Sequence, residues 1–167
     1  GAVGLAVTIG LRLKGARPII PADFSPKRRE LAAKMGADVV IDPAKETPYA
    51  KLPVGRRAVI FECVGVPGLL QQIFEAAPRD ARIVIAGVCM EPDRLEPFFG
   101  IVKELAVQFV LGYTPEEFAR CLPLLGEGQV DGQQLDTGKV GLDGVKGAFA
   151  ELANPERHTK ILVEPWR

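Results

Sequence analysis

Gly1-Ala2-Val3-Gly4 opens the chain, an apolar run continues to Leu13, and Pro18-Ile19-Ile20-Pro21-Ala22-Asp23 follows. We interpret this stretch as the later part of a G-x-G-x-x-G pattern, followed by a helix, a strand and an acidic residue. Gly1 and Gly4 would be the second and third glycines of the pattern, and the first would stand two residues before the chain begins. Asp23 lies 19 residues after Gly4, which is about where such a unit carries a carboxylate.

This pattern suits a dinucleotide. A Cβ at Gly1 would keep the backbone away from a pyrophosphate, and Gly4 lets the helix pack close to a sheet. The unpaired N–H groups at the helix start, with the positive end of the helix dipole, bind phosphates. Asp23 would accept the hydroxyls of the adenosine ribose and repel a 2′-phosphate, which favours NAD over NADP. An ordinary tight turn at Gly1 and Gly4 is the alternative.

The strand that should precede the pattern is missing from the sequence. We therefore expect a piece of a longer enzyme: a single NAD-binding Rossmann domain over residues 1–167, lacking its first strand at the N-terminus. Because the neighbours of an absent central strand would keep unpaired edges, we expect the isolated chain to be poorly stable or to borrow a strand from a partner.

The composition is that of a globular domain with a core. Hydrophobic residues make up 47% and charged residues 25% of the 167, and 21 basic residues balance 21 acidic ones. This balance gives no reason to expect nucleic acid or a membrane as a partner. Cys63, Cys89 and Cys121 are widely spaced and odd in number, which predicts free thiols in a reducing cytoplasm.

The remaining pattern alternates between helices and apolar strands, which is typical of a parallel sheet covered on both faces. The helix over 3–14 is apolar all round, so we expect it to be buried. Gly128–Gly141 reads as a polar loop, and a late helix should present Ala148, Phe149 and Leu152 on one face. Expected strands are 18–22, 39–41, 58–62, 82–86, 106–111 and 160–163; the other expected helices are 26–35, 67–76, 98–104, 115–125 and 145–153, with a helical turn within 42–55.

Ser25 and Pro26 predict the N-cap and first residue of the second helix. Its first turn carries Lys27, Arg28 and Arg29. We expect Lys27 and Arg29 to form a solvated basic patch. Arg28 has two open interpretations, a further member of that patch or a contact to the ribose beside Asp23.

Two predicted strands end in glycine, at Val64-Gly65 and at Ala86-Gly87-Val88. Ligands of open α/β sheets bind beyond the carboxyl ends of the strands, where glycine leaves room for a flat ring. Each glycine alone could equally belong to an ordinary turn, but the two together favour a cleft.

The ordered series of these segments resembles one family, the zinc-type medium-chain dehydrogenases that include the alcohol dehydrogenases. The resemblance covers essentially the whole chain as the cofactor-binding domain of that family. The matching segments are Gly1–Leu5, Asp23, Lys34–Asp38, Phe61–Gly65, Arg82–Val88, Leu142-Asp143 with Ala148-Phe149, and Lys160–Leu162.

The resemblance implies NAD as cofactor and hydride transfer with an alcohol or aldehyde in the full-length parent, the isolated chain being inactive. It implies no catalytic residue within the chain, and a homodimer through the edge strand near Ala106–Leu111. The implied cofactor-binding residues are Gly1, Ala2, Val3, Gly4, Asp23, Arg28, Val64, Gly65, Ala86, Gly87, Val88, Val110 and Leu111.

The family's catalytic zinc is implied for the parent, but most of its ligands would lie in an N-terminal barrel domain that is absent here. Cys63, Cys89, Cys121 and His158 have the spacing of neither zinc site of the family, and we assign no metal ligand. We expect His158, the single histidine, to be exposed.

Three other functions stay open. A zinc-free, NADPH-dependent quinone or enoyl reductase of the same superfamily is disfavoured by Asp23. A methyltransferase that binds the ribose of S-adenosylmethionine is disfavoured by the family series after Asp23. A catalytically silent nucleotide-binding or dimerisation fragment would keep the fold without the chemistry.

Overall fold

The computed structural model describes residues 1–167 and is built around a three-stranded parallel sheet. Its strands are β1 (Val59–Glu62), β2 (Arg82–Ile85) and β3 (Ala106–Phe109), in the order β1-β2-β3. Glu62 pairs with Ile85, and Ile85 pairs with Phe109, so the carboxyl ends of the strands lie at one edge. This is the expected α/β arrangement, and it brings the loops after the three strands side by side.

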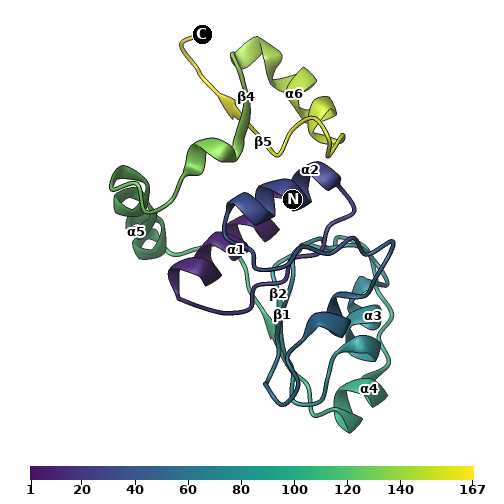
Figure 1. Ribbon diagram of the computed structural model, residues 1–167. Coiled ribbons are helices and arrows are strands. Elements are labelled where there is room, and N and C mark those ends of the chain that lie inside the picture. Colours follow the sequence, from purple (N-terminus) through teal and green to yellow (C-terminus); the bar gives the residue numbers. More distant parts are fainter.

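Helices lie toward both faces of this sheet (Figure 1). Toward one face are α3 (Leu69–Ala76) and α4 (Pro97–Val102), and toward the other are α1 (Ala2–Leu13) and α2 (Pro26–Lys34). The core is thin, since 16 of 167 residues are buried. Its main cluster joins α3 to β2 through Ile73, Phe74, Ile83 and Ile85, and a smaller one consists of Ala58, Ala77 and Ala81.

Helix α1 begins and ends one residue before the predicted range 3–14, and it is not buried all round. Leu5 and Thr8 are buried, whereas Val3 is 47% exposed and Leu13 is also exposed. Helix α2 has the predicted N-cap, because the Ser25 hydroxyl accepts a hydrogen bond from the Arg28 amide.

The predicted strands 18–22 and 39–41 form only one parallel bridge, Ala22 with Ile41. Pro18 and Pro21 have no N–H to donate, which limits the ladder. The pairing that does form uses the carbonyl of Ile19 and the amide of Ile41, which donates to Pro21. This pair therefore stands apart from the three-stranded sheet, which corrects the expectation of one continuous sheet.

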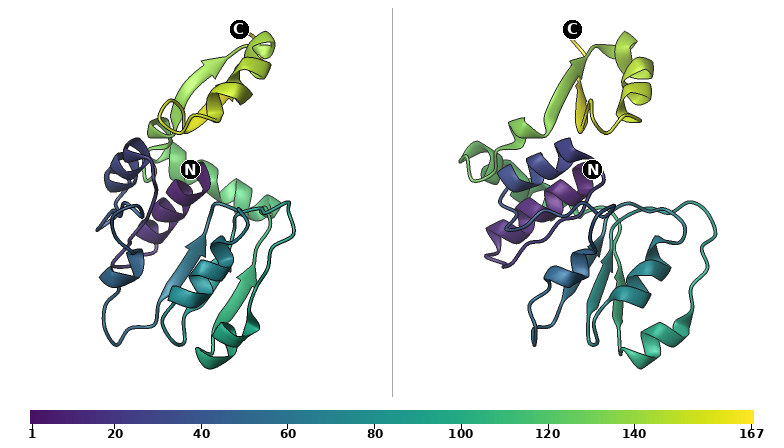
Figure 2. Two further views of the ribbon diagram at one scale, coloured as in Figure 1. Left: turned by 90° about the vertical axis from the view of Figure 1, so that its right-hand side faces the viewer. Right: turned by 45° about the vertical axis from the view of Figure 1, so that its right-hand side comes forward.

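The C-terminal residues also depart from the prediction. Residues 128–141 are not only a loop: β4 (Asp136–Val140) pairs in parallel with β5 (Lys160–Val163) in a separate two-stranded sheet. Between them lies α6 (Val145–Leu152), where Ala148 is buried but Phe149 is 74% exposed. Figure 2 shows this β4-α6-β5 unit standing beyond α2, away from β1–β3. The unit therefore adds no strand to the main sheet.

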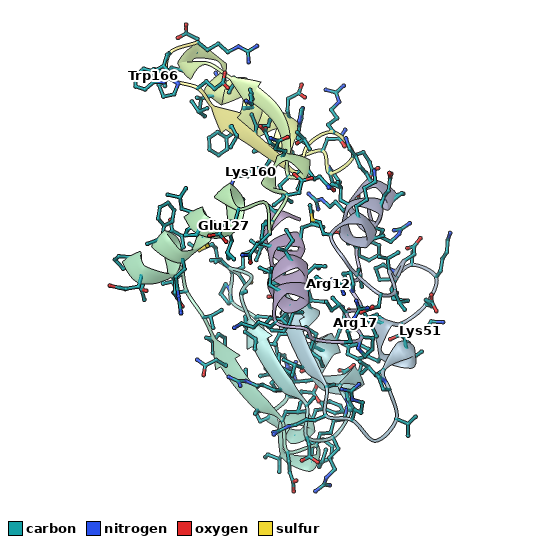
Figure 3. All side chains as sticks on the ribbon, turned by 60° about the vertical axis from the view of Figure 1, so that its left-hand side comes forward. Arg12, Arg17, Lys51, Glu127, Lys160 and Trp166 are labelled. Carbon is teal, nitrogen blue, oxygen red and sulfur yellow. The ribbon has the colours of Figure 1, made fainter.

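Three short helical turns and one longer helix complete the fold. They are η1 (Pro48–Lys51), η2 (Gly132–Gln134), η3 (Leu142–Gly144) and α5 (Pro115–Gly126). Helix α5 starts with a capping box in which Thr114 and Glu117 satisfy each other's amides. It connects β3 to the C-terminal unit. Trp166 projects from the far end of that unit and is 95% exposed (Figure 3).

No helix of the chain combines the length and the apolar character that crossing a lipid bilayer requires.

Candidate functional site

The first part of the site is the N-terminus of α1. Gly1 is its N-cap and Ala2, Val3 and Gly4 form its first turn. A Cβ on Gly4 would stand 3.7 Å from the Cβ of Cys63, the residue after β1, so the helix start lies directly beside the end of that strand. The amides of this turn have no acceptor within the helix, which suits an anion.

Asp23 and Arg28 lie against this turn. Asp23 follows the Ala22–Ile41 bridge, and its Oδ2 lies 3.1 Å from the Gly1 nitrogen, which is the charged terminal amine of this chain. Its Oδ1 accepts one from the amide of Ser25 at 2.9 Å. The Arg28 guanidinium is 3.9 Å from Asp23 Oδ2 and 3.8 Å from where a Cβ of Gly1 would stand. The predicted ribose and phosphate residues are thus brought together.

The Nε of Arg28 is buried without a hydrogen-bond partner. Arg29 and Lys27 both make hydrogen bonds within the protein, which corrects the expectation that they form a solvated patch. Arg29 is 16% exposed: it donates to the carbonyls of Asp23 and Phe24 and lies 3.2 Å from Asp42. Lys27 donates to the carbonyls of Glu156 and Arg157.

The loops after β1 and β2 form the second part of the site. Gly65 has φ +74°, and a Cβ there would come within 2.5 Å of the Val88 carbonyl carbon. A Cβ on Gly87 would come within 2.7 Å of the Val64 nitrogen. The predicted pair Val64-Gly65 and the predicted segment Ala86–Val88 therefore contact each other through their backbones, which only glycine allows at these two positions.

Val110 and Leu111 follow β3 at the same edge, and the Val110 amide donates to the Ile85 carbonyl at 3.1 Å. Leu111 is 90% exposed, so it is the outermost of the predicted site residues. The described hollows lined by Tyr113, Pro115 and Phe118 and by residues 163–167 contain none of the predicted cofactor residues.

Glu62 contacts the candidate site but is not among the predicted residues. It ends β1, is 5% exposed and uses Oε1 to accept hydrogen bonds from the amides of Val64 and Gly65. The available signal was a lone carboxylate at the end of an otherwise apolar strand, directly before a glycine turn, because a buried charge needs partners.

Cysteine and histidine side chains do not gather into a metal site. No group of three or more His, Cys, Asp or Glu side chains could hold a metal ion. All three thiols are free, and burial raises the pKa of Cys63 to about 11, with the Glu62 carboxylate adding to the rise. His158 is partly buried rather than exposed, with Nδ1 2.9 Å from the Thr137 carbonyl oxygen.

The geometry is that of a Rossmann-type nucleotide-binding unit, and comparison with known proteins identifies its family. The family model described as zinc-binding dehydrogenase matches residues 2–127. The chain belongs to the zinc-binding dehydrogenase family. The match ends before β4, so the second sheet lies outside the matched region.

One relative and two solved structures give the scale of the likeness. The chain is 31% identical to (R,R)-butanediol dehydrogenase of Bacillus subtilis, over 99% of this chain and 49% of that protein. The crystal structure of the 2R,3R-butanediol dehydrogenase of that organism superposes with a TM-score of 0.83 at 30% identity, over 99% of this chain and 48% of that one.

A Sinorhizobium meliloti protein, a putative zinc-binding dehydrogenase bound to NADP, superposes with a TM-score of 0.82 at 27% identity, over 99% of this chain and 50% of that one. The chain therefore spans about half the length of the relatives it matches. This family membership removes the methyltransferase alternative.

Proposed function

We propose that this chain binds NAD across the carboxyl edge of β1–β3 and serves hydride transfer between an alcohol or aldehyde and the cofactor in an alcohol dehydrogenase-like oxidoreductase. One observation carries the proposal: the first turn of α1 lies beside the end of β1, and Arg28, whose guanidinium is 3.9 Å from Asp23, approaches Gly1 at the start of that turn. A pyrophosphate on the α1 amides would place an adenosine ribose within reach of Asp23.

The residues present fit the cofactor. Gly65 and Gly87 let the two loops after β1 and β2 contact each other through their backbones. The unpartnered Nε of Arg28 is a donor that a ribose or phosphate oxygen would satisfy. Val88, Val110 and Leu111 offer apolar surface for the nicotinamide ring, which when bound supplies the hydride-accepting carbon. The contribution of this chain is to hold and orient that ring.

The zinc that a parent of this family implies does not fit this chain, because no cluster of metal-ligating side chains is present. Alcohol activation and the choice of substrate belong, in this proposal, to the residues of a longer protein. The Bacillus subtilis proteins compared above are named for butanediol, so butanediol is the first substrate to assay with a longer protein.

Asp23 is the reason to propose NAD rather than NADP. Its carboxylate lies beside Gly1 and Ser25, where a 2′-phosphate would bring a second negative charge. The alternative, an NADPH-dependent reductase, relies on Arg28 offsetting that charge. The NADP-bound relative from Sinorhizobium meliloti keeps this alternative worth testing.

A thermal-shift and fluorescence titration with NADH and, separately, NADPH tests the proposal. We expect NADH to raise the melting temperature and NADPH to have little effect. Asp23→Asn should reduce the ratio of NADH affinity to NADPH affinity by about tenfold, which corresponds to ~1.4 kcal/mol. Asp131→Asn, on an N-cap carboxylate of the C-terminal half, is the control and should leave both affinities unchanged. Tighter binding of NADPH than NADH by the wild type would overturn the choice of NAD, and binding of neither would favour the silent fragment.

Strand β3 supports the proposed homodimer. All four of its residues are exposed, it pairs only with β2, and Phe109 and Leu111 add apolar surface at its end. An edge strand of this kind can pair with a second copy. Sedimentation should show a dimer that Val107→Lys dissociates.

The free thiols are consistent with the proposed reducing compartment, the cytoplasm.

A further inference from the structure

Glu62 is the most buried carboxylate of the chain, and no cation pairs with it. Its side chain is 5% exposed, and no Lys, Arg or His nitrogen forms a salt bridge with it. The charge is instead met by two backbone amides, those of Val64 at 2.6 Å and Gly65 at 2.8 Å, both on Oε1. Hydrogen bonds to an ionised acceptor are roughly twice as strong as neutral ones.

These two amides have no other acceptor. Val64 and Gly65 lie outside every helix and strand, and neither donates to a backbone carbonyl. Where β1 ends, the Glu62 carboxylate therefore takes the place of the backbone carbonyls that accept hydrogen bonds within a sheet. It thereby fixes the conformation of the turn. Loss of the carboxylate would leave two amides unpaired in a crowded site.

The same residue also ties down the second loop of the site. The backbone carbonyl of Glu62 accepts hydrogen bonds from the amides of Ala86 at 2.8 Å and Gly87 at 3.0 Å. A Cβ on Gly87 would come within 2.5 Å of Glu62 Oε2, so the Gly87 backbone rests on the carboxylate. One residue thereby fixes both loops against each other.

We infer that Glu62 is a positioning residue for the cofactor cleft: its carboxylate holds the Val64-Gly65 turn against Gly87-Val88 and so shapes the surface on which the nucleotide lies. The inference deepens the proposed function and rests on it. Glu62 acts through the two loops and does not itself touch the ligand. Its removal is therefore expected to weaken nucleotide binding while the helices and the three-stranded sheet persist.

The experiment compares Glu62→Gln with Glu96→Gln, an exposed glutamate whose side chain accepts no hydrogen bond. NADH affinity is measured by fluorescence on the full chain, and amide hydrogen exchange of Val64 and Gly65 is followed by NMR. In the wild type both amides should be protected although no backbone carbonyl pairs with them. In Glu62→Gln they should exchange faster, and the NADH dissociation constant should rise about tenfold, as expected when a charged acceptor becomes neutral.

Four results would contradict the inference about Glu62 or the function on which it rests. Unprotected Val64 and Gly65 amides in the wild type would overturn the inference, whether or not Glu62→Gln folds. Equal NADH affinity of the wild type and Glu62→Gln would overturn it too, while leaving the proposed function intact. Failure of the wild type itself to bind NADH would refute the proposed function and the cofactor role of Glu62 together. An equal loss of affinity in Glu96→Gln would show a general charge effect and contradict a role specific to Glu62.

Discussion

Gly65 contacts the backbone of Val88 so closely that a Cβ on Gly65 would come within 2.5 Å of the Val88 carbonyl carbon. Gly65 also has φ +74°, a conformation that costs an L side chain free energy. The two requirements are independent, and both arise where the loops after β1 and β2 meet. This contact makes the candidate cleft sensitive to single methyl groups.

Gly65→Ala should therefore lower the free energy of unfolding by about 2–4 kcal/mol, from strain and overpacking together. Gly10→Ala is the matched control, because Gly10 lies within α1 with nothing within 4 Å of an added Cβ. That control should stabilise the chain by roughly 0.5–1 kcal/mol. Urea titrations followed by circular dichroism measure both, and equal stabilities of the two variants would contradict the close contact.

Ile83 should be the most costly apolar residue to truncate. It is fully buried in β2 and packs with Ile73 and Phe74 of α3. Ile83→Ala should lower the free energy of unfolding by about 2–5 kcal/mol. Ile83→Val, at about 0.5–1.5 kcal/mol, allows a measurement if the alanine variant does not fold. Val54→Ala, at a fully exposed position, should change it by less than about 0.5 kcal/mol; a comparable loss there would argue against a core centred on Ile83.

Lys27 links α2 to the C-terminal unit. Its Nζ donates to the carbonyl oxygens of Glu156 at 3.1 Å and Arg157 at 2.9 Å, just before β5. Lys27→Gln should raise the amide exchange rates of residues 154–160 while changing the global free energy of unfolding by less than about 1 kcal/mol. Lys34→Gln, whose partner is Glu30 on the same helix, should leave those rates unchanged. Unaltered exchange in Lys27→Gln would show that the unit is held by other contacts.

Cys63 should resist alkylation at neutral pH. Burial raises its pKa from 9.0 to about 11, and the thiolate is the form that reacts. Iodoacetamide at pH 8 should modify the exposed Cys89 and Cys121 first, and Cys63 should react appreciably only as the pH approaches 11. Mass spectrometry of tryptic peptides gives the order, and early labelling of Cys63 would refute the burial.

The raised pKa of Cys63 also predicts how the stability of the chain changes with pH. Between about pH 9 and 11 the unfolded chain loses the Cys63 proton while the folded chain keeps it, so the folded state binds more protons. The Cys63 contribution to stability is therefore complete below pH 9 and is lost as the pH rises toward 11. Cys63→Ala should remove this part of the alkaline loss in urea titrations at pH 8 and pH 10.5.

Local chemistry was enough to predict much of this chain. The Ser25 cap starts α2, and the apolar runs 58–62, 82–86 and 160–163 become strands because burying them stabilises an extended segment. Glycines at strand ends predicted the loops that meet at the sheet edge, because a residue without a Cβ allows two backbones to approach closely.

The tertiary structure decided what depends on distant partners. Asp136–Val140 has no apolar run, and it becomes β4 only because Asp136 and residues 138–140 pair with Lys160–Val163. Thr137 is skipped in this register, and its hydroxyl donates to the Lys160 carbonyl. Pro18 and Pro21 reduce an apolar run to a single bridge because they lack donors. Glu62 became a site residue only when the turn after β1 placed two amides on its carboxylate. A sequence pattern records what each residue prefers locally, whereas pairing, register and the partners of a buried charge are fixed by segments far apart in the chain.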